Sequence, residues 1–342
     1  MAELSKLTSA RWARVAVTAA LLGGAVFFFR EQLGFISQGV GAVRTASPLW
    51  VGISVLVCAL SFLAMGEVMA VLMAAGGVKV GRGQALALVL AANAVSSSLP
   101  GGPALSTVLQ YKVQRAWGAS VMVIGWFIVL SGALSTLWLV ILGLGAVVLF
   151  GASFSVASLV AVGIGMTALA FGVYWVANNP WFLERVATAT LPLVNRMLRR
   201  APEVGMEGVV AQIRQLQSVT LPLSKLVSVT LLSLLNRVFD LLTLWAAVVA
   251  VTGVIPAMAL VPNGTNIAGI TLAFLTAKII GATGVTPGGL GPLEAALTAT
   301  LIAVGMQAAT ALAAVLVYRM VSFILATAIG WVVYLVGLKE KP

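Results

Sequence analysis

Six ionisable side chains interrupt long apolar stretches of the sequence: Glu67, Arg237, Asp240, Lys278, Glu294 and Arg319. Their formal charges sum to zero, which would allow all six to pair with one another. A charge that faces lipid at the centre of a span costs at least about 2.5 kcal/mol, so we expect these side chains to face the protein interior. They could line a polar pathway for a headgroup or proton, or they could simply hold helices together, and spacing alone leaves both readings open.

Spacing predicts some of the partners. Arg237 and Asp240 are three residues apart, so on a helix they share a face and could pair locally. Glu294 follows Pro292 by two residues, in a first helical turn where the helix dipole favours an acid. Arg319 is then the expected distant partner of Glu294 or Asp240. Ion coordination or proton relay through the three acids is an alternative, with Glu67 as the candidate coupling residue.

Two Pro-Gly-Gly breaks interrupt apolar segments, at Pro100-Gly101-Gly102 and at Pro287-Gly288-Gly289-Leu290-Gly291. Proline removes a backbone donor and glycine weakens a helix. Unpaired backbone groups are tolerated in hydrocarbon only where protein packs on them or a wet cavity borders them. The helix N-termini after the breaks would suit an anionic headgroup such as phosphate. Alternatively, each break is an ordinary turn outside the membrane, because Pro-Gly-Gly is a common turn sequence.

The composition indicates a membrane protein and excludes several kinds of chemistry. Of 342 residues, 61% are hydrophobic and 8% are charged, against about 25% charged in soluble domains. The sequence has no histidine, which excludes histidine general bases, Ser-His-Asp triads and imidazole metal ligands. The single Cys58 excludes disulfides and cysteine metal sites within one chain. We therefore predict a protein that is not an enzyme, with no catalytic residues, metal or cofactor.

Apolar segments predict about six full crossings, at 15–29, 48–75, 121–150, 154–176, 226–254 and 311–338. The segment 121–150 could instead be a hairpin broken near Ser131-Gly132. The first segment reads as an uncleaved span. The net charge of +11 comes from basic residues between apolar segments, as the positive-inside rule expects, and not from a nucleic-acid surface. This pattern predicts a multi-pass protein of the cell membrane with both termini and an amphipathic linker, 178–225, in the cytoplasm.

Two shorter pairs of apolar runs flank the breaks, at 85–98 with 103–113 and at 267–283 with 293–304. We interpret them as re-entrant half-helix pairs. The order span, broken pair, span then occurs twice, in units of about 48–150 and 226–338, within a single transmembrane domain of residues 1–342. The number of crossings between the units makes them face opposite ways. Such inverted repeats place a binding site near the bilayer midplane, and the predicted fold class is an all-α polytopic membrane protein of this kind.

The run Thr286-Pro-Gly-Gly-Leu-Gly-Pro-Leu-Glu294, followed by Gly305 and by Arg319 in the last span, resembles the transmembrane, flippase-like domain of lysylphosphatidylglycerol synthases. The earlier Leu99-Pro-Gly-Gly and the downstream Lys112, Arg115 and Gly118 agree with it. The resemblance is to the stand-alone members of the family, which lack the soluble synthase domain. The resemblance implies translocation of a lipid or lipid-linked precursor between leaflets. Many members carry an acid shortly after the first break, and the stretch from Pro103 to Lys112 has none, which weakens a headgroup role there.

These observations predict a substrate site and a partner class. The predicted substrate-binding residues are Pro100, Gly101, Gly102, Lys112, Arg237, Asp240, Lys278, Pro287, Gly288, Gly289, Gly291, Glu294 and Arg319. The expected substrate is a membrane lipid with an anionic or glycosylated headgroup, and a cell-envelope synthase or glycosyltransferase is a candidate partner. Two alternatives stay open: an ion- or proton-coupled transporter of a small solute, and a non-transporting membrane partner of a cell-envelope lipid or glycan synthase.

Overall fold

The computed structural model describes residues 40–99, 101–149, 221–256, 266–282 and 286–337, with isolated positions between 172 and 192. These residues contain helices and no β-strand. The predicted all-α polytopic membrane fold is therefore confirmed, although the exact number of crossings is not. The predicted spans at 15–29 and 154–176, the residue Pro100 and nearly all of the linker 178–225 lie outside the described residues.

Four helices are long and apolar enough to cross a membrane. They are α3 (Pro48–Ala75), α6 (Val121–Leu149), α10 (Leu223–Thr252), and a continuous helix made of α13 (Ala308–Arg319), η4 (Met320–Leu325) and α14 (Ala326–Gly337). Each corresponds to one predicted span. Because α6 is uninterrupted, the alternative of a hairpin at Ser131-Gly132 is wrong.

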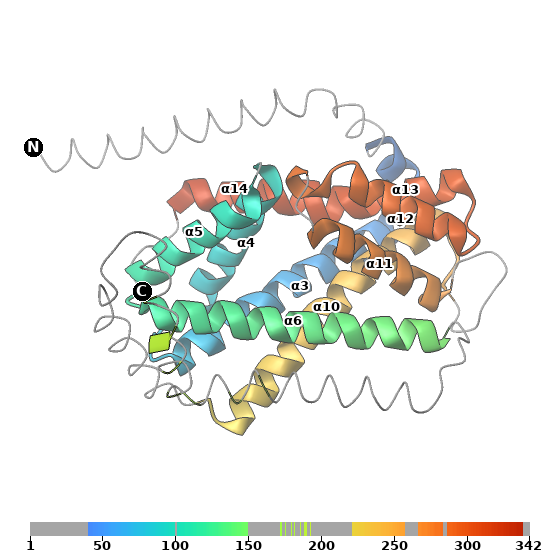
Figure 1. Cartoon of the computed structure of the whole chain (residues 1–342). Coiled ribbons are helices and arrows are strands. Elements are labelled where there is room, and N and C mark those ends of the chain that lie inside the picture. Colours follow the sequence, from blue (N-terminus) through green and yellow to red (C-terminus); the bar gives the residue numbers. More distant parts are fainter. Residues whose placement is uncertain are drawn as a thin grey trace, which may run out of the picture.

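Two broken pairs of shorter helices lie between these spans. The first pair is α4 (Arg82–Ser98) with α5 (Gly102–Ala116), and the second is α11 (Ile267–Ala282) with α12 (Pro292–Ala303), with the short η3 (Pro287–Gly289) in its break. Figure 1 shows the two pairs toward opposite ends of the long helices. Gly101 and Gly288 have φ angles of 68° and 60°. Glycine adopts this left-handed conformation without steric penalty, which explains its presence at both breaks.

The spans α3 and α10 pack along each other through a regular hydrogen-bonded seam. Three serines spaced by seven residues donate to backbone carbonyls of α10. Ser47, just before α3, donates its backbone N–H to Ala250 at 2.8 Å, and within α3 the hydroxyl of Ser54 donates to Thr243 at 3.1 Å and that of Ser61 to Asn236 at 3.1 Å. Acceptor numbers fall as donor numbers rise, so the two helices are antiparallel. Small polar residues allow backbones to approach closely and bond across helices in a membrane. The seam thus joins the first spans of the two sequence units.

The remaining helices pack across the two units. The first half of each broken pair contacts the last span of the other unit: α4 packs on α14, and α11 packs on α6. The apolar core has two main parts, one built mainly by α3, α4, α5 and α6 and the other by α10, α11, α12 and α13. The breaks are therefore held between the two halves of the chain.

Close contact between α4 and α14 at Gly330 gives a test of this packing. A Cβ atom at Gly330 would lie 2.3 Å from the carbonyl oxygen of Leu90, a backbone atom that cannot move aside cheaply. We expect Gly330→Ala to lower the free energy of unfolding by about 1–3 kcal/mol through overpacking. Thermal unfolding of the purified protein in detergent measures the change. The matched control is Gly125→Ala on α6, where nothing lies within 4 Å of the added atom; equal losses in the two variants would contradict the packing.

Candidate functional site

A buried ion pair holds the second break together. Arg319 Nε lies 2.5 Å from Glu294 Oε1, and only 5% of Arg319 and 8% of Glu294 is exposed. Arg319 Nη2 also donates to the carbonyl of Gly288 at 2.8 Å, and Glu294 Oε2 accepts from the backbone N–H of Gly291 at 2.6 Å. The pair therefore satisfies one backbone carbonyl and one backbone N–H within the break. Of the two partners predicted for Arg319, the structure pairs it with Glu294.

The ion pair of Arg319 and Glu294, called the clamp below, lies near the middle of a span. Arg319 lies close to the centre of the helix Ala308–Val336, which is long enough to cross a bilayer. Its guanidinium carbon stacks over the ring of Phe323, 4.3 Å from the centroid. The same ring contacts the break closely, since a Cβ at Gly288 would lie 2.2 Å from Phe323 Cε2. Gly288 therefore contacts the last span at mid-length and not at an end.

The two breaks lie against each other. A Cβ at Gly288 would also lie 2.8 Å from the carbonyl oxygen of Ser97, in the last turn of α4 just before the first break. The neighbouring Ser98 Oγ accepts a hydrogen bond from Trp331 Nε1 of α14 at 2.9 Å. On the other side of the first break, a Cβ at Gly102 would lie 2.1 Å from the carbonyl of Ser96. The second break thus contacts the end of α4, directly before the first break, although the two segments are far apart in sequence.

A second charged cluster surrounds Asp240 on α10. Lys278 Nζ of α11 lies 2.5 Å from Asp240 Oδ2, and the hydroxyl of Tyr318 on α13 donates to Asp240 Oδ1 at 3.4 Å. Arg237 is farther away, with Nη1 3.9 Å from Asp240 Oδ2, and its Nη2 donates instead to the hydroxyl of Ser135 on α6. Four helices therefore meet at this cluster, and the local Arg237–Asp240 pair predicted from spacing is its loosest ion pair.

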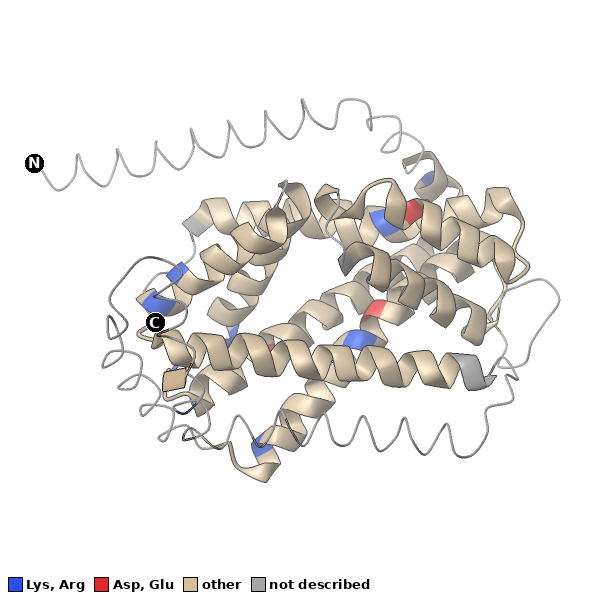
Figure 2. Ribbon diagram, viewed as in Figure 1, with Lys and Arg blue, Asp and Glu red and all other residues tan. Residues whose placement is uncertain are grey.

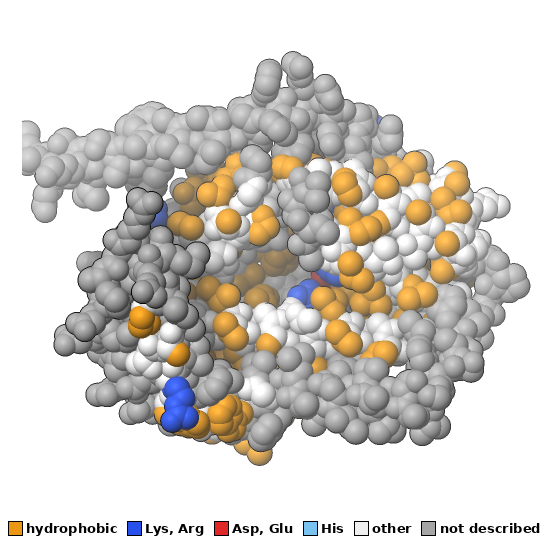
Figure 3. All heavy atoms as spheres, in the orientation of Figure 1, with side chains coloured by type: hydrophobic (Ala, Val, Ile, Leu, Met, Phe, Trp, Pro, Cys, Tyr) orange, Lys and Arg blue, Asp and Glu red, His pale blue; other side chains and the backbone are white. Residues whose placement is uncertain are grey.

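The Asp240 cluster carries one positive charge in excess, because it holds Arg237 and Lys278 against a single carboxylate. The Nε of Arg237 is buried and has no hydrogen-bond partner within the described part of the chain. Lys278 and Asp240 are each partly exposed, at 28% and 18% of the side chain. Figure 2 shows basic and acidic residues along the middle of the helices, and Figure 3 shows basic and acidic side chains in a hollow at the centre of one face. The cluster can therefore attract an anion.

The six charges do not all pair with one another, although their zero sum would allow it, because Glu67 has a partner outside the set. Glu67, within α3, pairs at 3.1 Å with Arg82, the first residue of α4, whose side chain is 83% exposed. The sequence did not indicate this partner, because Arg82 lies outside the apolar segments. Because Glu67 pairs with Arg82, it does not neutralise the Asp240 cluster, which keeps its net positive charge.

Not all predicted residues are brought together. Lys112 is exposed on α5, more than two turns from the first break. Pro287 and Gly289 lie in η3 beside the clamp. Ser135 and Tyr318 were not predicted; the position of Tyr318 next to Arg319 was the only sequence signal for it. Across the described ranges, no three His, Cys, Asp or Glu side chains come together as a metal site.

The clamp makes a testable prediction about stability. Arg319→Met leaves the buried Glu294 carboxylate without its partner, so we expect a loss of about 3–5 kcal/mol in the free energy of unfolding. The double variant Arg319→Met, Glu294→Met removes both charges and should lose clearly less than the sum of the two single variants. Denaturant unfolding in detergent measures all three. Strict additivity would contradict a direct buried pair, and Arg82→Ala in the exposed pair serves as the control with little expected change.

Comparison with known families agrees with this architecture. The family model for the lysylphosphatidylglycerol synthase TM region matches residues 11–330, which include both breaks, the clamp and the Asp240 cluster. A search of curated proteins gives no match to the sequence. The matched family is a transmembrane region and not a catalytic domain. The match covers most of the sequence and agrees with the resemblance carried by Thr286–Glu294 and Arg319, so the chain belongs to the lysylphosphatidylglycerol synthase TM region family.

Proposed function

We propose that this protein translocates an anionic lipid, or a lipid-linked precursor, between membrane leaflets, with Arg237 and Lys278 binding its headgroup. The observation that carries the proposal is the excess positive charge of the Asp240 cluster. An uncompensated cation within a span is expensive, and such residues mark substrate pathways in membrane proteins. A phosphate that reaches the cluster would supply the missing negative charge. The sign of the cluster favours an anionic headgroup over a neutral glycosylated one.

The arrangement of the helices supports a site reached from both sides. The first spans of the two units are antiparallel, and the broken pairs lie toward opposite ends of the long helices (Figure 1). Both relations are expected of an inverted repeat, whose binding site lies at the interface of the repeats near the midplane. We therefore propose that both pairs are re-entrant, one from each side of the membrane. The N-terminus of α12, at Pro292, then points its dipole toward the bilayer interior.

The two charged groups have different roles in this proposal. Arg319 and Glu294 neutralise each other and keep the second break folded, so they support the pathway without needing the substrate. In the Asp240 cluster, a headgroup phosphate competes with Asp240 for Lys278, while Tyr318 can continue to donate to the carboxylate. Charge-assisted contacts from Arg237 and Lys278 would hold the phosphate at close range. Loss of one cation should therefore slow translocation more than it affects folding.

Translocation of a lipid implies a partner enzyme that makes it. A lipid that needs translocation is made on one leaflet, so a cell-envelope synthase or glycosyltransferase would supply it. From the basic residues that flank the spans, we propose that both termini lie on the cytoplasmic side of the cell membrane. Substrate would then enter from the cytoplasmic leaflet through the pathway between the two broken pairs.

Leaflet exchange of fluorescent phosphatidylglycerol in proteoliposomes tests the proposal. Dithionite added outside bleaches only the outer leaflet, so the extent of bleaching reports exchange. We expect the wild-type protein to increase exchange, and Lys278→Ala and Arg237→Gln to reduce its rate by about tenfold or more, which corresponds to about 1.4 kcal/mol. Lys79→Ala is the matched control, because it removes an exposed cation from the turn after α3.

Two results would contradict the proposal. One is wild-type exchange no faster than in protein-free vesicles, and the other is full exchange in both cluster variants. Exchange at the protein-free rate, together with pH-dependent uptake of a small solute, would favour a coupled solute transporter instead.

A further inference from the structure

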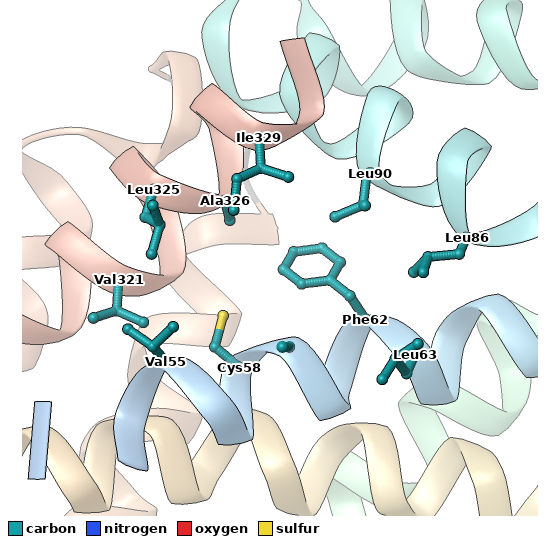
Figure 4. Close-up of a pocket in the computed structure, with 11 residues that line it drawn as sticks. Val55, Cys58, Phe62, Leu63, Leu86, Leu90, Val321, Leu325, Ala326 and Ile329 are labelled. Carbon is teal, nitrogen blue, oxygen red and sulfur yellow. The ribbon is translucent and has the colours of Figure 1, made fainter. Parts of the chain in front are cut away.

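An apolar groove of about 310 Å³ lies between α3, α4 and the helix formed by η4 and α14. Figure 4 shows the ring of Phe62 on α3 reaching into it, with Leu90 of α4 on one side and Ala326 and Ile329 of α14 on the other. All of its lining side chains are hydrophobic, and none is charged. A site of this size falls at the lower end of small-ligand pockets, about 300–1,000 Å³. Its chemistry suits hydrocarbon and excludes a polar ligand.

The groove opens sideways, toward the lipid side of the helices. Several of its lining residues are also among the exposed large apolar side chains of the chain: Leu63 is 46% exposed, Leu325 38% and Ile329 45%. In a membrane-spanning chain this exposed apolar surface faces acyl chains and not water. The groove is therefore accessible to a lipid without passage through the protein.

The groove shares a helical segment with the clamp. η4, a π-helical stretch from Met320 to Leu325, begins directly after Arg319. Val321 and Leu325 of η4 line the groove, whereas Phe323 lies over the Arg319 guanidinium. Such π segments inside α-helices occur frequently at functional sites. One short segment thus borders the hydrocarbon groove on one side and the charged break on the other.

The groove also lies level with the Asp240 cluster. The seam between α3 and α10 joins Ser54 to Thr243 and Ser61 to Asn236, in antiparallel order. Cys58, midway between the two serines, therefore lies opposite Asp240 along the seam, and Cys58 lines the groove. The hydrocarbon site and the charged site are at the same height in the bundle, as the two parts of one lipid would require.

We propose that this groove binds one hydrocarbon chain of the lipid whose anionic headgroup binds at Arg237 and Lys278. The proposal rests on the translocase function and adds a specific binding site for the hydrocarbon chain, called the chain site below. The chain enters between α3 and α14, covers Phe62 and contacts η4. Headgroup binding and chain binding are then linked, so that only a lipid with both parts occupies the full site.

Photocrosslinking of the full-length protein in vesicles tests this chain site. The probe is phosphatidylglycerol with a diazirine midway along one acyl chain, present as a minor component in phosphatidylcholine, and mass spectrometry maps the crosslinked residues. We expect crosslinks enriched severalfold at the groove residues Phe62 and Leu325 over Leu56, a lipid-facing residue of α3 outside the groove. Ala59→Phe, which fills the groove, should remove the enrichment. Ala328→Phe, exposed on α14 outside the groove, should retain it.

The dependence of crosslinking on the lipid headgroup distinguishes the chain site from ordinary contact with bilayer lipid. Lys278→Ala should lower the enrichment of the phosphatidylglycerol probe, and a phosphatidylcholine probe should show little. Three results would each contradict the chain site: equal crosslinking at the groove and at Leu56, no effect of Ala59→Phe, or equal enrichment with both probes. If the chain site is contradicted while leaflet exchange proceeds, the translocase proposal stands without it. If enrichment depends on Lys278 but no exchange occurs, the lipid site stands and translocation fails.

Discussion

Unwound backbone inside a helical membrane protein has to find partners, because lipid supplies none. The second break meets this constraint with one buried ion pair: Arg319 binds the carbonyl of Gly288, and Glu294 binds the N–H of Gly291. Since each ion also neutralises the other, the break can lie against the middle of the last span. The contact between Gly288 and Ser97 then brings the first break to the same place. The rest of the site is arranged around this junction.

The clamp and the Asp240 cluster show how two groups of intramembrane charges can have separate tasks. Arg319 and Glu294 are almost completely buried and form a neutral pair, which suits a structural role. The Asp240 cluster is partly exposed and carries a net positive charge, which suits a ligand. Tyr318 and Arg319 are adjacent in sequence on α13 and reach one group each.

Much of this arrangement could be predicted from the sequence, and the reasons are physical. Long apolar runs define the four described spans, and the glycines with φ near 60° could be expected wherever a helix has to break in hydrocarbon. The sequence limited the expected partner of Arg319 to Glu294 or Asp240, and only the packing of α12 against α13 selects Glu294. Sequence alone could not show that Arg82 takes Glu67, because the pair depends on how tightly the chain turns after α3. The regular spacing of Ser47, Ser54 and Ser61 was visible but has meaning only once α10 lies beside it.

The depth of the two breaks is the central physical claim, and spin labels can measure it. In a Cys58→Ala background, single cysteines replace Ser97 and Thr286, and a nitroxide on each reports its relative accessibility to oxygen and to a water-soluble nickel complex in lipid vesicles. Both labels should lie deep in the hydrocarbon region, with positions 97 and 286 at similar depth. Labels at the level of the headgroups, freely accessible to the nickel complex, would contradict it.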